Sequence, residues 1–160
     1  MHFDIPRFYD MEIPEMTTDT DQFSDLEIIA LTAVGESDSL GETGMTQTIN
    51  TVFNRVAANK PWMGGNNARN VCLQKGQYDT WDAGTNDRQR ILAIGTSSPT
   101  YGPYVVALQL AQSAINGTLA DTTNGACSYG DDGEKPLVHP GSVPCLIDGQ
   151  RTFFNLAAVA

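Results

Sequence analysis

Apolar positions recur at helical spacing in a first segment near the start of the chain. Its apolar residues are Leu26, Ile29, Ala30 and Ala33. Ser24 and Glu27 stand at the start of this run with the spacing of a capping box, in which each side chain bonds the backbone of the other residue. The pattern therefore predicts a helix that begins after Ser24 and ends at Gly35.

Three further helices follow from the same kind of pattern. The second is predicted over residues 43–58, with Pro61 stopping it. Its expected buried face comprises Met45, Ile49, Val52, Phe53 and Val56. A third helix is predicted from about residue 86 to 99. A fourth is predicted from Pro103 to Asn116-Gly117, a pair typical of a helix C-cap.

The segments between and after these helices are rich in glycine and proline. Residues 59–85 are predicted to be loop-rich, although they contain both tryptophans. From Leu119 onward we expect loops or short strands, with Phe153 and Phe154 tying the C-terminus back onto the core. The sequence thus predicts a mainly α fold, with one domain over residues 23–160.

Acidic residues dominate the charge of the chain. The net charge is −10, and half of it lies in residues 1–22, where six acidic residues face only Arg7. This segment has no helical period, so we expect an extended acidic arm that docks onto a larger assembly. Strong acidity argues against nucleic acid as a partner and against electrostatic capture by anionic polymers or lipids.

Neither a membrane span nor an export signal is expected. The longest apolar runs fall far short of the roughly 18 residues that a span requires. The N-terminus carries acidic residues where a Sec signal would have basic residues and an apolar core. We therefore expect synthesis in the cytoplasm and delivery by another route.

The chain contains three cysteines, Cys72, Cys127 and Cys145, with no C-x-x-C pair. The favoured interpretation is that they are small buried hydrophobic residues. A Cys127–Cys145 disulfide and a zinc site that uses His139 with two of the cysteines are the alternatives, although the spacings fit no common zinc site. No cofactor or metal is expected.

Glu36 is the candidate for catalytic chemistry. It follows the first predicted helix, where the negative end of the helix dipole and partial burial both disfavour the carboxylate and raise the pKa. A protonated carboxyl is what a general acid needs to cleave a glycosidic bond. A solvated glutamate after a helix is the alternative interpretation of its position.

The segment around Glu36 resembles the cell-wall hydrolase family typified by spore cortex-lytic enzymes. The hallmark of that family is roughly Y-G-E-A-x-G-E-x-x-E-G-x, a small and apolar run, and N-R-V. Here Gly35-Glu36-Ser37 and Gly44 align without gaps to Asn54-Arg55-Val56. A V-x-x-x-G-Q-F block is similar to residues 71–78, and an I-G-x-H-x-F-Y block is similar to residues 149–154. The resemblance covers about residues 25–155.

This resemblance implies a lysozyme-like, mostly helical fold and cleavage of the N-acetylmuramic acid to N-acetylglucosamine bond of peptidoglycan. It assigns the acid to Glu36. Three departures from the family pattern stand out: Val34 replaces a tyrosine, the loop 38–42 differs, and Arg151 replaces a histidine.

The product depends on a second carboxylate. The candidates are Asp38, Glu42, Asp79 and Asp82, and for each of them a solvated surface acid is the favoured interpretation. Without a second carboxylate, Glu36 acts as acid and then as base, which yields a 1,6-anhydro end as in lytic transglycosylases. The resemblance allows both outcomes, and we favour the lytic transglycosylase.

Four residues are candidates for substrate binding: Gln77, Tyr78, Trp81 and Tyr129. A loop amide can bond N-acetyl groups, and an aromatic face can stack on a sugar. Aromatic residues that cap a small core are the alternative for Tyr78 and Trp81. For Asn54 and Arg55, a buried structural role is favoured over substrate contact.

We therefore predict a peptidoglycan glycosidase whose partner is the glycan strand. The small size and the acidic arm favour a phage lysin, either released through a holin or docked on a virion. The alternative is an inactive, lysozyme-like structural protein of a phage virion or tail, suggested by the missing histidine and the altered loop.

Overall fold

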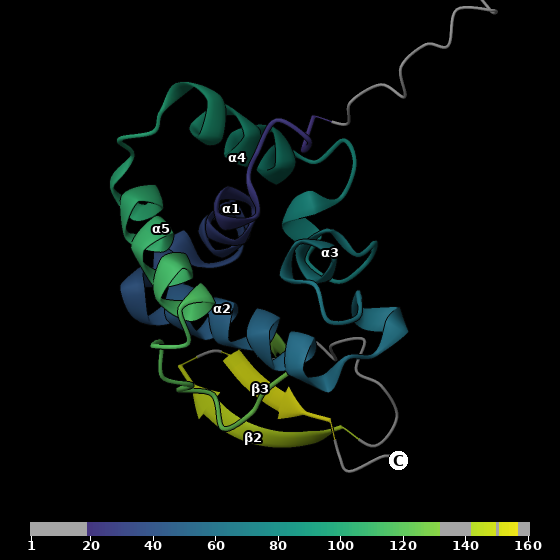
Figure 1. Ribbon diagram of the computed structural model, residues 1–160. Helices are drawn as coiled ribbons and strands as arrows, with labels where there is room; N and C mark the ends of the chain where they lie inside the picture. The colour runs from purple at the N-terminus through teal and green to yellow at the C-terminus, as the bar shows by residue number, and fades with distance from the viewer. Residues whose placement is uncertain (1–18, 132–141, 150, 157–160) are drawn as a thin grey trace, which may run out of the picture.

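The computed structural model describes residues 19–131, 142–149 and 151–156. Within these ranges the chain is mainly helical and ends in a small sheet (Figure 1). The helices are α1 (Asp25–Ser37), α2 (Gly41–Ala58), α3 (Ala68–Leu73), α4 (Asn86–Ser97) and α5 (Gly102–Ile115), and the strands are β1 (Ser128–Asp131), β2 (Val143–Asp148) and β3 (Arg151–Asn155). The single turns of 3₁₀ helix are η1 (Asp38–Leu40), η2 (Pro61–Met63) and η3 (Asp79–Trp81).

Helix α1 begins at the predicted capping box. The Glu27 N–H donates to Ser24 Oγ at 3.2 Å, and the Ser24 N–H donates to Glu27 Oε1 at 3.0 Å. The predicted end at Gly35 is wrong, because the helix continues to Ser37. A Cβ at position 35 would lie 1.9 Å from Thr80 Oγ1, so the glycine serves a close approach and does not stop the helix. Glu36 consequently lies in the last turn of α1.

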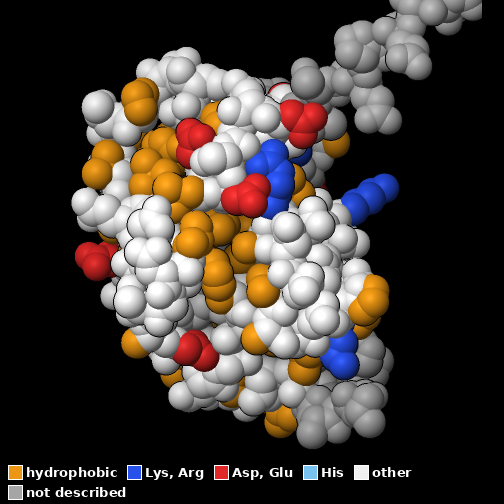
Figure 2. All heavy atoms as spheres, viewed as in Figure 1, with side chains coloured by type: hydrophobic (Ala, Val, Ile, Leu, Met, Phe, Trp, Pro, Cys, Tyr) orange, Lys and Arg blue, Asp and Glu red, His pale blue; other side chains and the backbone are white. Residues whose placement is uncertain are grey.

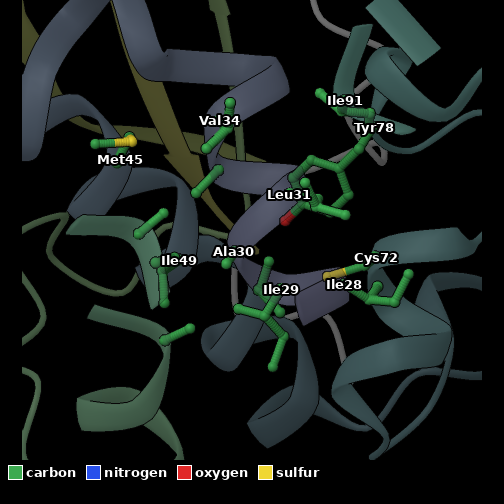
Figure 3. Packing of buried hydrophobic residues seen from close by; sticks show 14 of the residues in the cluster. Ile28, Ile29, Ala30, Leu31, Val34, Met45, Ile49, Cys72, Tyr78 and Ile91 are labelled. Carbon is green, nitrogen blue, oxygen red and sulfur yellow. The ribbon is translucent and has the colours of Figure 1, made fainter. Parts of the chain in front are cut away.

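Helix α1 is the centre of the hydrophobic core. Its residues from Ile28 to Leu31 are fully or almost fully buried. Figure 3 shows their side chains together with those of Met45 and Ile49 from α2, Cys72 from α3, Tyr78 and Ile91. Because neighbours surround α1 on several sides, the helix is held in a fixed position, and so is Glu36 at its end.

The predicted second, third and fourth helices are confirmed as α2, α4 and α5, with small shifts at their ends. Helix α2 ends at Ala58 and is capped by Asn59, which takes the left-handed conformation with φ of 50°, two residues before the predicted stop at Pro61. Helix α5 ends at Ile115 and is capped by Asn116, and Gly117 follows with φ of 74°. The C-cap interpretation of this pair is therefore confirmed.

The loop-rich segment over residues 59–85 contains a helix that the sequence pattern missed, α3. Asn67 caps it by accepting a hydrogen bond from the Asn70 N–H at 3.0 Å, and Val71 and Cys72 are buried. A helix of six residues is too short to display a period, which explains why the pattern did not show it.

The predicted short strands form an antiparallel sheet in the order β1-β3-β2. Strand β3 is central, and Phe153 pairs with Tyr129 of β1 and with Leu146 of β2. Phe153 is fully buried, whereas Phe154 is partly exposed. The sheet carries Tyr129 and Arg151 toward the helical part of the domain.

Most of the predicted acidic arm, residues 1–18, lies outside the described residues. The next residues contact the domain. Arg88 forms an ion pair with Asp19 at 2.6 Å, and Arg69 donates to the carbonyl of Thr20 at 2.8 Å. Among the described helices, none is both long and apolar enough to cross a membrane.

One face of the molecule is hollowed and apolar. Figure 2 shows hydrophobic side chains gathered in a hollow between the α5 side and the α3 side, with acidic and basic side chains together at its upper edge. Large exposed hydrophobic residues of the described chain include Trp62, Tyr101 and Ile115. The face in view thus carries no basic groove of the kind that binds nucleic acid.

Candidate active site

The carboxyl of Glu36 meets a tyrosine from the sheet. Glu36 lies in the last turn of α1 and is partly buried. The Tyr129 hydroxyl on β1 donates to Glu36 Oε1 at 2.8 Å. The two residues are 93 positions apart in the chain, so the contact exists only because the sheet folds against the end of α1.

The other side of the Glu36 carboxyl faces η3. The Thr80 N–H donates to the carboxylate, and the acidic side chains of Asp79 and Asp87 lie close enough to repel its charge. Gly35 allows this arrangement, since its bare Cα lets Thr80 approach the last turn of α1. The Thr80 hydroxyl has no hydrogen-bond partner among the described residues.

These surroundings raise the pKa of Glu36 to about 7. Burial is the main cause, because a desolvated carboxylate is disfavoured. The hydrogen bond from Tyr129 opposes the rise, the negative charge of Asp79 adds to it, the Thr80 N–H opposes it and Asp87 adds to it. A carboxyl with this pKa is substantially protonated near neutral pH, as a general acid must be, and as a carboxylate it can take a proton back.

Three polar residues of α2 hold the loop that leads into β1. Asn50 accepts from the Thr122 N–H at 3.0 Å and donates to the Ala120 carbonyl at 3.1 Å. Asn54 donates to the Ala126 carbonyl at 2.9 Å, and Arg55 donates from Nε to the Cys127 carbonyl. The structure thus gives Asn54 and Arg55 the structural role that the sequence favoured. Their bonds fix the start of the strand that carries Tyr129.

Arg151 is a site residue that sequence reasoning missed, since it appeared there only as a departure from the family pattern. It is 4% exposed and lies over the Tyr129 ring, with 4.8 Å between Cζ and the ring centroid. Its guanidinium also donates to Ser37 Oγ at 2.9 Å, directly after Glu36. No local sequence signal could have placed it there, because both contacts are long-range.

Two of the four predicted substrate-binding residues, Tyr78 and Trp81, are buried in the core. Tyr78 and Trp81 are 1% and 6% exposed, which leaves neither ring face free to stack on a sugar. The Tyr78 hydroxyl is hydrogen-bonded to Thr51 at 2.9 Å, and Trp81 Nε1 donates to Thr32 at 2.8 Å. Both residues therefore cap the core, which was the alternative interpretation, and their burial contradicts the prediction that they stack on the substrate.

The other two predicted binding residues keep a place near the surface. Gln77 is partly buried, and its Oε1 accepts from Arg55 at 3.2 Å. Tyr129 reaches the candidate acid and is also partly buried. Gln77 thus remains a candidate for substrate contact, whereas Tyr129 is tied to Glu36.

The four candidates for a second carboxylate lie in different surroundings. Asp38 pairs with Arg90 at 2.7 Å and accepts from the Tyr101 hydroxyl at 2.9 Å, which together lower its pKa against the effect of burial. Glu42 lines a cavity of about 470 Å³ between α2 and β2, and Glu36 is not among the residues that line it. Asp79 and Asp82 are exposed, and Asp79 is near enough to act on Glu36 through its charge.

The three cysteines are free. Cys72 and Cys127 are buried and Cys145 is partly buried, so the disulfide alternative is absent from the structure. His139, required by the zinc alternative, lies outside the described residues. Within the part of the chain that is described, no three His, Cys, Asp or Glu side chains are grouped as a metal site would need.

The raised pKa makes a prediction about stability. Between pH 4.5 and about 7 the folded chain holds a proton on Glu36 that the unfolded chain has lost, so stability falls as pH rises through this window. Glu36→Gln removes the free-energy cost of ionising this buried carboxyl. We expect the variant to be more stable than wild type by about 2–3 kcal/mol at pH 8 and equally stable at pH 4. Urea unfolding at both pH values measures the difference in stability between the variant and wild type. An equal difference at pH 4 and pH 8 would contradict the raised pKa of Glu36.

Comparison with known proteins agrees with this geometry. Residues 39–144 match the family described as Cell Wall Hydrolase, and Glu36 precedes the matched range by three residues. The fold is similar to the catalytic domain of the germination-specific lytic transglycosylase SleB from Bacillus anthracis, with a TM-score of 0.53 and 20% identity over 83% of this chain and 97% of that one. No curated protein matches the chain. The family match covers well over half of the sequence and confirms the resemblance, and the chain therefore belongs to the cell wall hydrolase family.

Proposed function

We propose that this protein cleaves the N-acetylmuramic acid to N-acetylglucosamine bond of peptidoglycan, with Glu36 as general acid and then general base. The observation that carries the proposal is the Glu36 carboxyl itself. It is partly buried, its pKa lies near 7, and the Tyr129 hydroxyl holds it in one orientation. Membership of the cell wall hydrolase family supports peptidoglycan as the substrate.

The first step transfers the Glu36 proton to the glycosidic oxygen as the bond from that oxygen to the muramic acid C1 breaks. Positive charge develops at C1 and the ring oxygen, and Glu36 is left as a carboxylate. The Thr80 N–H and the Tyr129 hydroxyl both donate to the Glu36 carboxyl, so they stabilise the carboxylate as it is produced.

We further propose a lytic transglycosylase in preference to a hydrolase. The Glu36 carboxylate takes the proton from the C6 hydroxyl of the same muramic acid, and the C6 oxygen bonds C1 to give a 1,6-anhydro end. The surroundings of the other acids support this choice. Asp38 is held by Arg90, and Glu42 lines a cavity whose lining does not include Glu36. The similar fold of the SleB catalytic domain, named as a lytic transglycosylase, also supports it.

Gln77 is the proposed contact for an N-acetyl group. Its side chain is partly buried beside Arg55, which fixes one end of the amide. The proposed biological setting is a phage lysin that reaches the wall through a holin or on a virion. The acidic charge of residues 1–22 supports docking of that segment onto a larger assembly.

The products of cleavage test this proposal. Purified peptidoglycan from several wall types is digested with the wild-type protein, and the masses of the released fragments are determined by mass spectrometry. Anhydro-muramic ends are the expected result. Reducing muramic ends would replace the transglycosylase with a hydrolase and direct attention to Asp79 as the second carboxylate. No cleavage of any wall type would overturn the proposal in favour of an inactive, lysozyme-like structural protein.

A further inference from the structure

Arg151 contacts Tyr129, one partner of the hydrogen bond between Tyr129 and Glu36, and Ser37, the neighbour of the other partner. It is the first residue of β3, and β3 pairs directly with the strand that carries Tyr129. Its Cζ lies 4.8 Å from the centroid of the Tyr129 ring. Its Nη1 donates to Ser37 Oγ at 2.9 Å, and Ser37 is the residue that follows Glu36 in α1.

The same guanidinium is anchored to α2 by its other nitrogen. Nη2 donates to the Gly44 carbonyl at 3.1 Å and to Gln47 Oε1 at 2.9 Å. The Gln47 amide in turn donates to Asp148 at 2.6 Å, so its orientation is fixed as well. The planar fork of an arginine suits this arrangement, in which several acceptors must be met at set angles. A lysine ammonium, as a compact point charge, cannot reproduce it.

We propose that Arg151 is a positioning residue that sets the Tyr129 hydroxyl against the Glu36 carboxyl by holding the ring of one and the helix end of the other. This inference rests on the proposed role of Glu36. A cation over the face of a phenol draws electron density from the ring and makes its hydroxyl a stronger donor. The bond to Ser37 fixes the last turn of α1, and with it the direction of the carboxyl.

A burial argument also favours a positioning role. Taking a guanidinium out of water is costly, and an apolar side chain of similar volume often supports a core equally well or better. Arg151 is nevertheless buried between Tyr129, Phe153, Ser37 and α2. Packing alone does not require a guanidinium here, so we assign its polar contacts to positioning Tyr129 and the end of α1.

The experiment is a double-mutant cycle with Arg151→Lys and Tyr129→Phe, read as kcat and KM on glycan strands. Each single variant is expected to lower kcat by about 10- to 100-fold, because small displacements of a catalytic group have effects of this size. KM should change by less than about threefold, since ground-state binding is retained. The double variant should be within about threefold of Tyr129→Phe alone, because both contacts of Arg151 serve the hydrogen bond that Tyr129→Phe has already removed.

Arg69→Lys supplies the matched control. Arg69 is a partly buried arginine that donates to the carbonyls of Phe23 and Thr20, at the opposite end of α1. Any effect that it has should multiply unchanged with that of Tyr129→Phe. If the effect of Arg151→Lys on kcat also multiplies unchanged with that of Tyr129→Phe, the positioning role is overturned and Arg151 is structural.

The pH profile gives a readout that a merely structural role would not move. The charged and titratable groups that face Glu36 are Tyr129 from β1, Tyr78 directly before η3, Asp79 from η3 and Asp87 from α4. The bond from Tyr129 favours the carboxylate, so its loss raises the pKa of Glu36 further. The basic limb of kcat/KM should therefore move to higher pH in both Arg151→Lys and Tyr129→Phe. A limb that stays in place for Arg151→Lys alone would contradict the proposal.

Two further measurements keep the test decisive. Gln47→Met removes only one acceptor of Arg151 and serves if Arg151→Lys does not fold; it should produce a smaller effect that vanishes in the Tyr129→Phe background. A carbon-13 NMR titration of Glu36 in each variant needs no substrate. If the wild type cleaves no wall, the proposed function fails, while the titration still decides whether Arg151 acts on Glu36.

Discussion

Glu36→Gln is expected to lower kcat for peptidoglycan cleavage by about 10²- to 10⁴-fold, the range that a positioned general acid contributes. The amide has the same shape as the carboxyl and can still accept from Tyr129, but it has no proton to transfer to the leaving oxygen. KM should change little, because the variant keeps the surface of the site. Release of soluble fragments from labelled walls, followed over time, gives both constants.

Glu27→Gln is the matched control at the other end of the same helix. Glutamine serves the capping box as well as glutamate does, so α1 should keep its first turn and the protein its activity. Full activity in Glu36→Gln would show that this carboxyl is not the acid. Equal losses in the two variants would point to a general sensitivity of α1 instead.

Gly35→Ala is expected to destabilise the fold and to impair the site together. The added Cβ would lie 1.9 Å from Thr80 Oγ1 and 2.7 Å from Thr80 Cβ, so either η3 or the end of α1 must shift. Overpacking of this kind costs about 1–3 kcal/mol, and we place this variant at about 3 kcal/mol because the whole of Thr80 is buried against the helix. Urea unfolding measures the loss.

Activity should fall further than stability explains, since the displaced segment includes the Thr80 N–H that bonds Glu36. Gly102→Ala in α5 is the control, because a Cβ there would meet nothing within 4 Å. Its effect should be small, within about 1 kcal/mol, because the helix preference of alanine over glycine is opposed by the crowding of a Cβ directly before Pro103. If Gly35→Ala is as mild as Gly102→Ala, the close contact with Thr80 does not hold the site.

Local sequence patterns predicted the helices because their causes are local. The capping box of Ser24 and Glu27 and the end of α5 at Asn116-Gly117 involve residues within one turn of each other. Gly35 shows the limit of such reasoning. A glycine at the end of an apolar run is typical of a helix stop, yet here it answers a close approach by Thr80, 45 residues away. Only the folded chain distinguishes the two causes.

The candidate active site also contains one residue that local sequence identifies and others that only the folded chain reveals. Glu36 was identified from its position at the end of a helix and from the resemblance of the surrounding segment to a family. Tyr129, which bonds Glu36, and Arg151, which bonds the next residue Ser37, come from strands about 90 to 115 residues later, and nothing in their local sequence indicates these contacts. Tyr78 and Trp81 illustrate the converse, because an aromatic residue in a glycine-rich segment gives the same local signal whether it faces a sugar or the core.

The titration of the Glu36 carboxyl tests the central claim most directly. Carbon-13 NMR on protein labelled at glutamate, with the Glu36 signal assigned by its absence in Glu36→Gln, follows this one group from pH 4 to pH 9. The account predicts a midpoint near 7 and a basic limb of kcat/KM at the same pH. A midpoint near the ordinary value of 4.5 would contradict it, because Glu36 would then be ionised at neutral pH and could not act as the acid.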